Sequence, residues 1–406
     1  MRRGSNLPRV GSFNRAVVLE AIRGSSRGLT RAQLGRRTRL APQTVSNVVK
    51  ELLDTQLIEE AGTLTRGGRG RPGTRLRLNP SARFAVGVHL DPAWLGIVAV
   101  DLSGAVIAEV YEPLPSPDQP AAVTRHLASR IEAAIGLTGL PRERLLGVGV
   151  AAPGPLDEEA GTVSPPLLPG WHRIPLRGAL AELTGATVLL EKDIIAAATA
   201  HTWRDAASGT ADYAFLYVGA GVALATVLGS EVVRGEGGNA GEAGHVPADP
   251  AGPRCQCGGA CLGAAAGELV MVRLARSAGI SLPGDRGQGP QMIDDAFQCL
   301  IGLAAQGDER AGEIFAQAGR SIARAIIPWS ELLDIRTLLV GGPHWDQMRA
   351  LVEPAAQELL TRHAVHATPA PIRMLASPLG RQVGPVGAAC LVLDEAYAPR
   401  ADSLLI

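Results

Sequence analysis

Three cysteines and one histidine lie close together between residues 245 and 261, and their types suit a metal ion. Cys255, Cys257 and Cys261 fall within seven residues, and His245 ends the upstream segment Gly-Glu-Ala-Gly-His. Three thiolates and one imidazole complete a tetrahedral zinc site, with sulfur at roughly 2.3 Å from the metal. Glycines and prolines in the intervening loop allow the chain to fold back on itself. We therefore predict a structural Zn2+ ion held by these four residues.

Two alternatives to zinc remain for this cluster. One is a set of unrelated buried thiols. The other is a disulfide framework, which is less favoured, because five cysteines in 406 residues is not the composition of a small disulfide-stabilised secreted domain.

The first eighty residues carry a second group of functional candidates and are strongly basic. They contain 16 Lys and Arg against 5 Asp and Glu, while the whole chain contains 39 of each, so the remainder is acidic. A basic head on an acidic body indicates a nucleic-acid-binding module joined to a domain of another kind. A disordered basic arm is the alternative, and the regular patterning of this segment argues against it.

Three short helices are expected in this head. The first is predicted over 14–23, the second opens at Thr30 and runs through Thr38, and Pro42 suits the first turn of the third. On the third helix, apolar residues recur at i, i+3, i+4 and i+7: Val45, Val48, Val49 and Leu52. Such a stripe predicts a buried face.

The opposite face of the third helix carries Gln43, Asn47 and Lys50. A polar face is normally only solvated. Here, however, the helix completes a helix-turn-helix pattern, and amide side chains can read adenine edges in the major groove. We predict that these three residues contact double-stranded DNA.

Two short strands, 57–60 and 75–78, make the head a winged helix-turn-helix. The turn between them contains Arg69-Gly70-Arg71-Pro72. Two arginines on a narrow extended backbone suit insertion into an A·T-rich minor groove. The alternative is a flexible basic loop that touches only phosphates.

The arginine density falls at Asn79-Pro80-Ser81, which predicts a DNA-binding domain over 1–80 and a separate body over 81–406. Met1-Arg2-Arg3 is basic, but no apolar signal segment follows it, and no window holds the roughly 18 apolar residues of a spanning helix. We therefore expect a cytoplasmic protein without membrane segments.

The body begins with three consecutive strands, predicted over 84–90, 95–101 and 105–111. An alternation of helices and strands follows: a helix over 121–137, a strand over 145–151, a helix over 176–183 and a strand over 187–190. This order indicates an α/β fold.

The zinc-ligand segment and several further motifs of the chain resemble the ROK family of sugar kinases and sugar-responsive repressors. The cysteine motif, Cys-Gln-Cys-Gly-Gly-Ala-Cys, is one residue shorter than the family's. The other matching motifs, in chain order, are Pro153-Gly154-Pro155-Leu156-Asp157, Pro169-Gly170-Trp171, Glu191-Lys192-Asp193, Gly341-Gly342 and Val386-Gly387-Ala388-Ala389. The resemblance implies an actin/hexokinase-like, ribonuclease H-like body with two lobes and a ligand cleft between them.

The head also resembles that of the family's repressors, which its kinases lack. The similarity includes Arg31-Ala32-Gln33-Leu34, Thr44-Val45-Ser46 and Gly70-Arg71-Pro72. It adds Thr44 and Ser46 to the predicted DNA-contacting residues.

The two phosphate loops of the family's kinases are altered in this chain. The first reads Asp-x-Gly-Gly-Thr in the kinases and His89-Leu90-Asp91-Pro92-Ala93 here, and in the second Gly219-Ala220-Gly221 is followed by bulkier residues. Only bare backbone N–H groups approach phosphates closely, and proline has none. Asp193 matches the family's catalytic base, but we predict no enzyme activity.

The resemblance places Asp193, Glu242 and His245 in an effector site. Three other sugar-contacting positions differ and hold Leu167, Lys192 and Gly263. Lost hydrogen-bond partners cost on the order of 1–3 kcal/mol each, and Lys192 adds a cation, which favours an anionic partner. We therefore expect an effector other than a simple neutral hexose, with Lys192 among its contacts. A salt bridge within the body is the alternative role of Asp193.

Taken together, these features predict a DNA-binding repressor that acts as a homodimer or tetramer, because two heads on adjacent half-sites gain affinity by avidity. A sugar-derived or other small molecule would be its effector. Two alternatives stay open: a residual sugar kinase, and a body that serves as a protein-interaction module.

Overall fold

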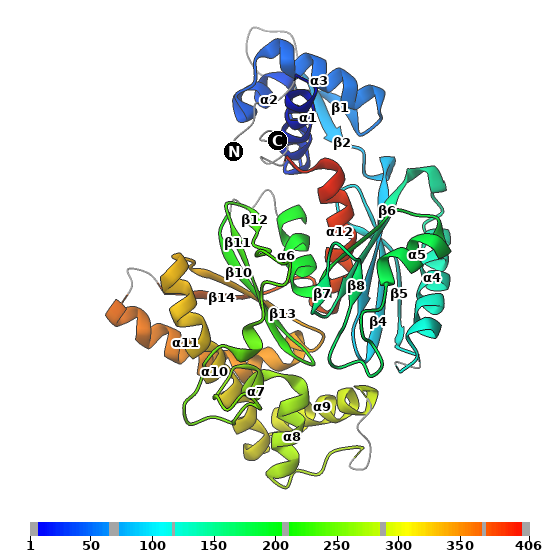
Figure 1. Cartoon of the computed structure of the whole chain (residues 1–406). Coiled ribbons are helices and arrows are strands. Elements are labelled where there is room, and N and C mark those ends of the chain that lie inside the picture. The colour runs from blue at the N-terminus through cyan, green and yellow to red at the C-terminus, as the bar shows by residue number, and fades with distance from the viewer. Residues whose placement is uncertain are drawn as a thin grey trace.

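The computed structural model describes residues 7–64, 73–115, 118–204, 211–284, 290–367 and 371–399. Figure 1 shows a small head at the top and, below it, two α/β lobes, each built on a five-stranded sheet. The predicted wing residues Arg69 and Arg71 lie outside the described residues. Among the described helices, none combines the length and apolarity needed to cross a membrane.

The head consists of three helices followed by a two-stranded antiparallel sheet. The helices are α1 (Leu7–Arg23), α2 (Arg31–Thr38) and α3 (Pro42–Asp54), and the strands are β1 (Ile58–Leu64) and β2 (Gly73–Leu78). The second and third helices and both strands lie where the sequence predicts them. The first helix begins at Leu7 rather than at residue 14, because the residues before Asn14 lack the apolar spacing on which the prediction depended.

Local side-chain chemistry sets the boundaries of these helices. Thr30 caps α2, since its backbone N–H donates to Gln33 Oε1 at 2.8 Å while its own hydroxyl accepts from the Gln33 backbone N–H. Pro42 begins α3. The predicted apolar stripe of α3 is confirmed as buried: Val45, Val48, Val49 and Leu52. The polar face of α3 is thereby turned outward.

The first lobe contains a sheet in the order β5-β4-β3-β6-β9. Its strands are β3 (Phe84–Leu90), β4 (Trp94–Asp101), β5 (Val106–Pro113), β6 (Leu145–Ala152) and β9 (Val188–Lys192). The first three pair antiparallel, and β6 and β9 extend the sheet in parallel. Helices α4 (Pro120–Leu137) and α5 (Leu176–Thr184) cover its outer face, and the small hairpin β7 (Leu156–Asp157) and β8 (Thr162–Val163) follows β6. All the predicted elements of this lobe are confirmed.

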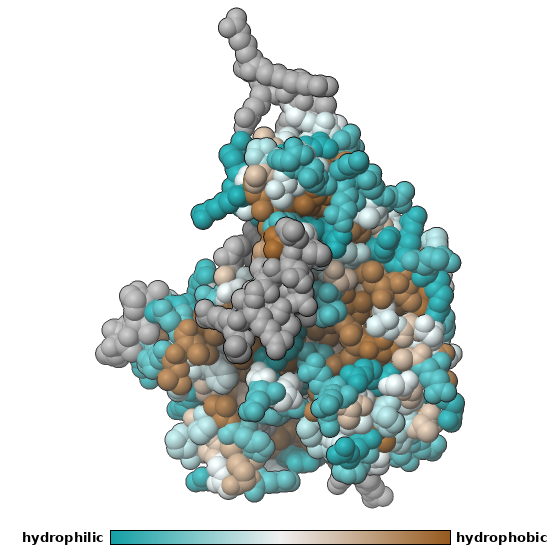
Figure 2. All heavy atoms as spheres, turned by 45° about the horizontal axis from the view of Figure 1, so that its top comes forward, coloured by the Kyte–Doolittle hydropathy of each residue, from teal (hydrophilic) through white to brown (hydrophobic). Residues whose placement is uncertain are grey.

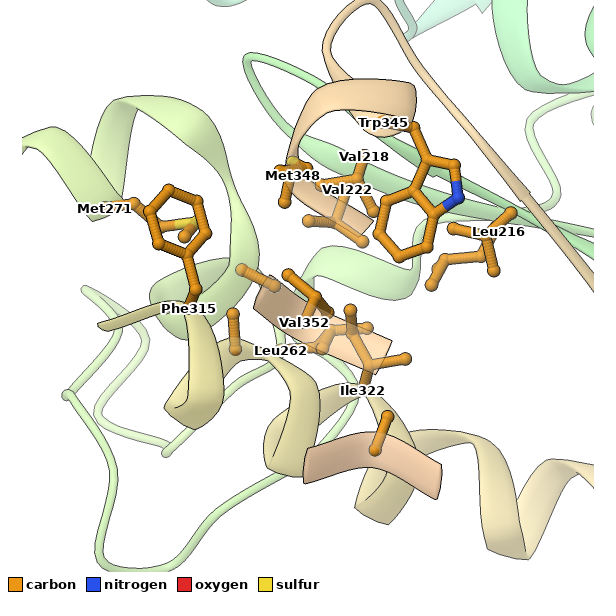
Figure 3. Close-up of a cluster of buried hydrophobic side chains, with 14 of the residues drawn as sticks. Leu216, Val218, Val222, Leu262, Met271, Phe315, Ile322, Trp345, Met348 and Val352 are labelled. Atoms are coloured by element: carbon orange, nitrogen blue, oxygen red, sulfur yellow. The ribbon is translucent and has the colours of Figure 1, made fainter. Parts of the chain in front are cut away.

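The second lobe contains a sheet in the order β12-β11-β10-β13-β14. Its strands are β10 (Tyr213–Val218), β11 (Val222–Leu228), β12 (Glu231–Val232), β13 (Thr337–Gly341) and β14 (Arg373–Ala376). Its helices are α7 (Gly263–Ala266), α8 (Glu268–Ser277), α9 (Pro290–Ala305), α10 (Glu309–Leu333) and α11 (Trp345–Ala367). Figure 3 shows their apolar core, in which Phe315 and Ile322 of α10 lie among Met271, Met348 and Val352.

Two helices, α6 (Asp193–Arg204) and α12 (Val383–Tyr397), lie between the two sheets (Figure 1). Glycines allow unusually close contact there. A Cβ added at Gly87 of β3 would lie 2.0 Å from the Pro385 oxygen, and one at Gly387 of α12 would lie 2.0 Å from the Ala196 oxygen. Neither position accepts a side chain without displacing the backbone, so the closing Val386-Gly387-Ala388-Ala389 motif serves helix packing.

The head packs directly against these central helices. Its α1 contacts α12, and the guanidinium carbon of Arg23 lies 3.5 Å from the ring centroid of Trp203, near the end of α6. Apolar residues of the head, including Ile22, belong to the same buried cluster as residues of α6 and α12. The head and the body therefore share a continuous core.

Candidate functional site

The four predicted metal ligands are brought together by a folded-back loop. Its two arms pair where the Ala248 N–H donates to the Ala260 oxygen and the Leu262 N–H donates to the Val246 oxygen, both at 2.9 Å. A tight turn at the tip is closed by the Cys255 N–H, which donates to the Gly259 oxygen at 2.8 Å. The pairing of the arms places Pro247 opposite Cys261, so His245 lies two residues along the chain from the position opposite this cysteine.

The four ligand atoms lie within 4.8 Å of one another. His245 Nδ1 is 3.6 Å from Cys255 Sγ, and Cys257 Sγ is 3.3 Å from Cys261 Sγ. Donor atoms of a tetrahedral zinc site lie about 3.6–3.8 Å apart, given metal–ligand distances of about 2.1–2.3 Å. The donor set and its spacing therefore fit zinc, and the motif that is one residue shorter still brings three sulfurs and one imidazole together.

Two local features suit this turn to thiolates. The Gly259 backbone N–H stabilises the charged form of Cys257 and so lowers the pKa of that thiol to about 6. A Cβ at Gly259 would lie 3.1 Å from Cys261 Sγ, so a larger residue would crowd the sulfur atoms. The glycine therefore leaves room for the ligands as well as supplying a hydrogen bond.

Lys192, at the end of β9, is buried and forms an ion pair with the exposed Glu242. Its ammonium nitrogen lies 2.5 Å from Glu242 Oε1 and donates to the Asn239 oxygen at 3.2 Å. The lysine side chain is 2% exposed, whereas that of Glu242 is 63% exposed. Lys192 therefore does not present an unpaired cation to the cleft, because Glu242 already pairs with its charge.

Asp193 begins α6 directly after this lysine. Its carboxylate accepts a hydrogen bond from the Ile194 N–H at 2.7 Å, and burial raises the pKa of Asp193 while the nearby His89 opposes that rise. Among the described residues Asp193 forms no ion pair. The alternative role of Asp193, a structural salt bridge within the body, therefore has no support from these residues. Asp193 and Glu242 are close enough to interact electrostatically.

Asn239 is a structural member of this region that the sequence interpretation missed. Its side-chain oxygen accepts from the Leu156 N–H at 3.0 Å, and its amide donates to the Leu156 oxygen at 2.8 Å. It thus connects the Pro153–Asp157 loop of the first lobe to the segment that carries Glu242. The Gly237-Gly238-Asn239-Ala240-Gly241 run was the available signal, because such a glycine-rich loop exposes backbone for side-chain contacts.

Two of the altered sugar-contacting positions also have clear surroundings. Leu167 is exposed. A Cβ at Gly263 would lie 2.9 Å from the Gly244 oxygen, so the present backbone has no room for a glutamate at that position. At this point the backbone of α7 packs against the short 3-10 helix Ala243–His245, whose last residue, His245, is a candidate zinc ligand.

The predicted DNA-contacting residues of α3 share an outward face. Gln43, Ser46, Asn47 and Lys50 are exposed, and Thr44 is half-buried. Gln43 Nε2 donates to Asn47 Oδ1 at 3.0 Å, which leaves the Asn47 amide hydrogens directed to other partners. Figure 2 shows that the face of the head turned toward the viewer is largely hydrophilic.

The loop that corresponds to the first kinase phosphate loop satisfies its own backbone. The Asp91 carboxylate accepts from the Ala93 N–H at 2.9 Å and from the Trp94 N–H at 3.3 Å, and Pro92 is buried. Burial raises the pKa of Asp91 to about 6. Backbone N–H groups that a phosphate would need are therefore engaged by a side chain.

Similar proteins of known type match most of the chain. Residues 92–395 match the ROK family. The DNA-binding transcriptional repressor Mlc of Escherichia coli is 26% identical over 376 residues, which cover 91% of this chain and 90% of Mlc.

Solved structures are also similar to this chain in fold. The structure of a ROK family transcriptional regulator, a homolog of E. coli MLC protein, has a TM-score of 0.74 at 24% identity, and the match covers 98% of both chains. That of a ROK family glucokinase from Streptomyces griseus, in complex with glucose and AMPPNP, has a TM-score of 0.63 at 25% identity and covers 76% of this chain and 98% of the glucokinase. Since the family match spans well over half of its residues, this chain belongs to the ROK family.

Proposed function

We propose that this protein is a sugar-responsive, DNA-binding transcriptional repressor. The observation that carries the proposal is the attachment of a basic three-helix head, with an outward polar face on α3, to a ROK body. Mlc, which matches 91% of the chain, is a DNA-binding transcriptional repressor. The glucokinase, which matches the body alone, binds glucose.

In this proposal the head reads DNA through α3. Asn47 and Gln43 contact base edges in the major groove, Lys50 contacts a phosphate, and Thr44 and Ser46 contact the backbone at the start of the helix. The wing arginines Arg69 and Arg71 enter the adjacent minor groove. Two copies of the chain present two heads to neighbouring half-sites, so the working form is a homodimer or a tetramer.

Zinc at His245, Cys255, Cys257 and Cys261 is the second part of the proposal. When bound, the ion supplies structural cross-linking of the folded-back loop and performs no reaction. Through His245 it holds the short 3-10 helix in place, and Glu242 immediately precedes that helix. The metal therefore orients one wall of the effector site.

We assign the effector site to Asp193, Glu242 and His245, with Lys192 in a supporting role. Two carboxylates accept hydrogen bonds from sugar hydroxyls, while the buried Lys192 ammonium fixes Glu242. Because that pair is internally neutral, the site favours a polyhydroxyl ligand over an anion. This replaces the anionic preference inferred from Lys192 alone.

Phosphotransfer is not part of the proposed function. The carboxylate of Asp91 engages the N–H groups of its loop and adds negative charge where a triphosphate would have to lie. ATP turnover with a panel of hexoses tests this directly. Formation of a sugar phosphate at a rate dependent on Asp193 would identify a kinase instead.

DNA selection tests the regulatory function. The full chain is mixed with random-sequence duplexes, bound DNA is enriched, and the affinity of the enriched sequence is measured with and without neutral sugars. A specific sequence whose affinity changes with one sugar supports the proposal. Specific DNA binding without a response to any sugar favours a protein-interaction role for the body.

A further inference from the structure

A cavity of about 170 Å³ lies between the two lobes, and none of its lining residues belongs to the zinc-ligand cluster or to the proposed effector site. His89, Trp94 and Tyr111 line it from the first lobe, and Tyr217 and Asp294 line it from the second. A cavity of roughly 150 Å³ is large enough to bind benzene. This space therefore suits a ligand built on one six-membered ring, and the proposed function assigns no ligand to it.

A glycine of the first-lobe sheet makes room for the cavity. His89 of β3, Gly96 of β4 and Tyr111 of β5 are paired neighbours across three adjacent strands, and all three line the cavity. A Cβ added at Gly96 would lie 2.9 Å from Tyr111 Cε1. The absence of a side chain at Gly96 therefore keeps the position between the two rings open.

His89 offers a buried hydrogen-bonding group to this space. Its side chain is 7% exposed, lines the cavity and has no hydrogen-bond partner among the described residues. Burial lowers the pKa of His89, and the nearby Asp193 opposes that change, so the imidazole is neutral and one of its nitrogens is an acceptor. Because buried polar groups are almost always hydrogen-bonded, this side chain indicates a ligand that donates to it.

Asp91 adds a carboxylate on the same side of the chain. Residues i and i+2 of a strand project to one face, and His89 and Asp91, which directly follows the end of β3, both line the cavity. Asp91 Oδ1 accepts from the Ala93 and Trp94 N–H groups. Within the described ranges, no hydrogen bond to Asp91 Oδ2 and no ion pair of Asp91 occurs. This wall of the cavity therefore presents two acceptors and one negative charge.

The charges of the second lobe also favour a cation. His344 Nδ1 lies 2.9 Å from Glu268 Oε1, and its Nε2 lies 3.3 Å from Asp294 Oδ1. Even when His344 is protonated, these two carboxylates leave one negative charge in the buried cluster. Arg381 also lines the cavity, but it is exposed, and its guanidinium carbon lies 4.5 Å from the ring centroid of Tyr111. The buried part of the cavity is therefore net negative.

Aromatic rings form much of the remaining wall. Trp94, Tyr111 and Tyr217 all line the cavity, and the ring of Tyr217 meets that of His89 edge to face. The faces of such rings attract ammonium groups, most strongly where water is excluded. Aromatic rings, a carboxylate and a neutral imidazole together suit an organic cation, whereas the same charges would repel a phosphate.

We propose that this interlobe cavity binds a small organic ammonium ion, whose ammonium group donates hydrogen bonds to His89 and Asp91 and whose carbon skeleton packs against Trp94 and Tyr217. The ligand is additional to the DNA and the sugar of the proposed function. Because its contacts come from both lobes, it favours the arrangement of the lobes in which these residues face one another. The competing arrangement is a protonated Asp91 with no ligand.

Calorimetric titration of the full-length, zinc-loaded protein with benzylamine tests the proposal. Benzylamine carries an ammonium group on one six-membered ring, benzyl alcohol has the same shape without the charge, and benzoate has the opposite charge. We expect one bound benzylamine per chain, benzyl alcohol affinity lower by about tenfold or more, and no binding of benzoate. Absence of benzylamine binding at millimolar concentration, or equal affinities for the amine and the alcohol, overturns the proposal.

Two variants locate the bound amine. Asp91→Asn removes the charge but keeps a side-chain oxygen for the Ala93 and Trp94 N–H groups, so the loop should keep its shape. It should weaken benzylamine binding by about tenfold or more. His89→Phe keeps a ring but removes the acceptor, should have a similar effect, and carries the test if Asp91→Asn does not fold.

Asp295→Asn is the matched control, because this carboxylate of α9 is exposed, and benzylamine affinity should be unchanged. Benzylamine binding that survives Asp91→Asn and His89→Phe places the amine elsewhere and overturns the proposal. Neither DNA nor sugar is present in these titrations, so their outcome is independent of the proposed regulatory function.

Discussion

Arg23 of the head stacks on Trp203 of the body, with its guanidinium carbon 3.5 Å from the ring centroid. Trp203 lies near the end of α6, and Asp193 begins the same helix at the proposed effector site. A helix of 12 residues is about 18 Å long. One rigid element therefore joins the effector site to the surface on which the head rests.

The contact between Arg23 and Trp203 predicts how ligand binding in the body affects DNA binding by the head. A ligand changes DNA affinity only by favouring one arrangement of the head and lobes over another. Arg23→Gln removes the cation that stacks on Trp203, so the sugar should change the DNA affinity of this variant less than that of the wild type. The variant should also lose about 1–2 kcal/mol of folding stability. Fluorescence anisotropy with the selected DNA, with and without sugar, measures this.

Arg27→Gln is the matched control for that experiment, since it removes the same charge from an exposed position just after α1. It should leave the response to sugar intact. Equal responses of the two variants would mean that the stacking contact does not transmit the signal.

The zinc assignment predicts one equivalent of zinc per chain in the purified protein. Cys257→Ser should lose the metal and lower the melting temperature, because binding free energy at such a site contributes to folding. The Cys299→Ser variant, which changes a cysteine outside the cluster, should retain the zinc ion. Elemental analysis and thermal unfolding provide the data, and a folded wild-type body with well under one equivalent would refute the assignment.

The polar face of α3 predicts two different effects on DNA binding. Asn47→Ala should cost about 1–3 kcal/mol and relax sequence preference, whereas Lys50→Ala should weaken binding to all sequences alike. Gln357→Ala, an exposed amide on α11, serves as the control. Competition between the selected DNA and its single-base variants distinguishes these effects. An unchanged affinity for Asn47→Ala would remove Asn47 from the reading face.

The Lys192–Glu242 pair predicts a combined loss of stability and ligand affinity. Glu242→Gln leaves the buried Lys192 ammonium without its counter-charge, which should lower the stability of the protein. The variant also weakens one hydrogen-bond acceptor for the sugar, which should cost about 1–3 kcal/mol of binding free energy. Glu236→Gln, an exposed carboxylate of the preceding segment, should have neither effect. Calorimetric titration and thermal unfolding of the full chain test both parts. Sugar binding that is unaffected by Glu242→Gln would place the ligand elsewhere.

The head was the most predictable part of the fold, since local patterns determine its elements. Val45, Val48, Val49 and Leu52 recur at helical spacing, and Thr30 with Gln33 forms a capping pair three residues apart. The metal-ligand cluster was predictable for the same reason, because its three cysteines are close in sequence.

The partners that sequence could not reveal are distant along the chain. Lys192 meets Glu242 fifty residues later, and His344 meets Glu268 seventy-six residues earlier. No spacing rule connects such residues, because the two sheets and the helices between them bring them together. The sequence therefore reveals the charge of Lys192 but not its partner Glu242.

The response of DNA binding to sugar tests the central claim most directly. The full-length, zinc-loaded protein is titrated against its selected DNA by fluorescence anisotropy at fixed salt, in the absence and presence of neutral sugars. We expect at least one sugar to change the affinity, and we expect Asp193→Asn to remove that change while leaving sugar-free DNA binding intact. Specific DNA binding that no sugar alters, or an Asp193→Asn variant that responds like the wild type, would contradict the account.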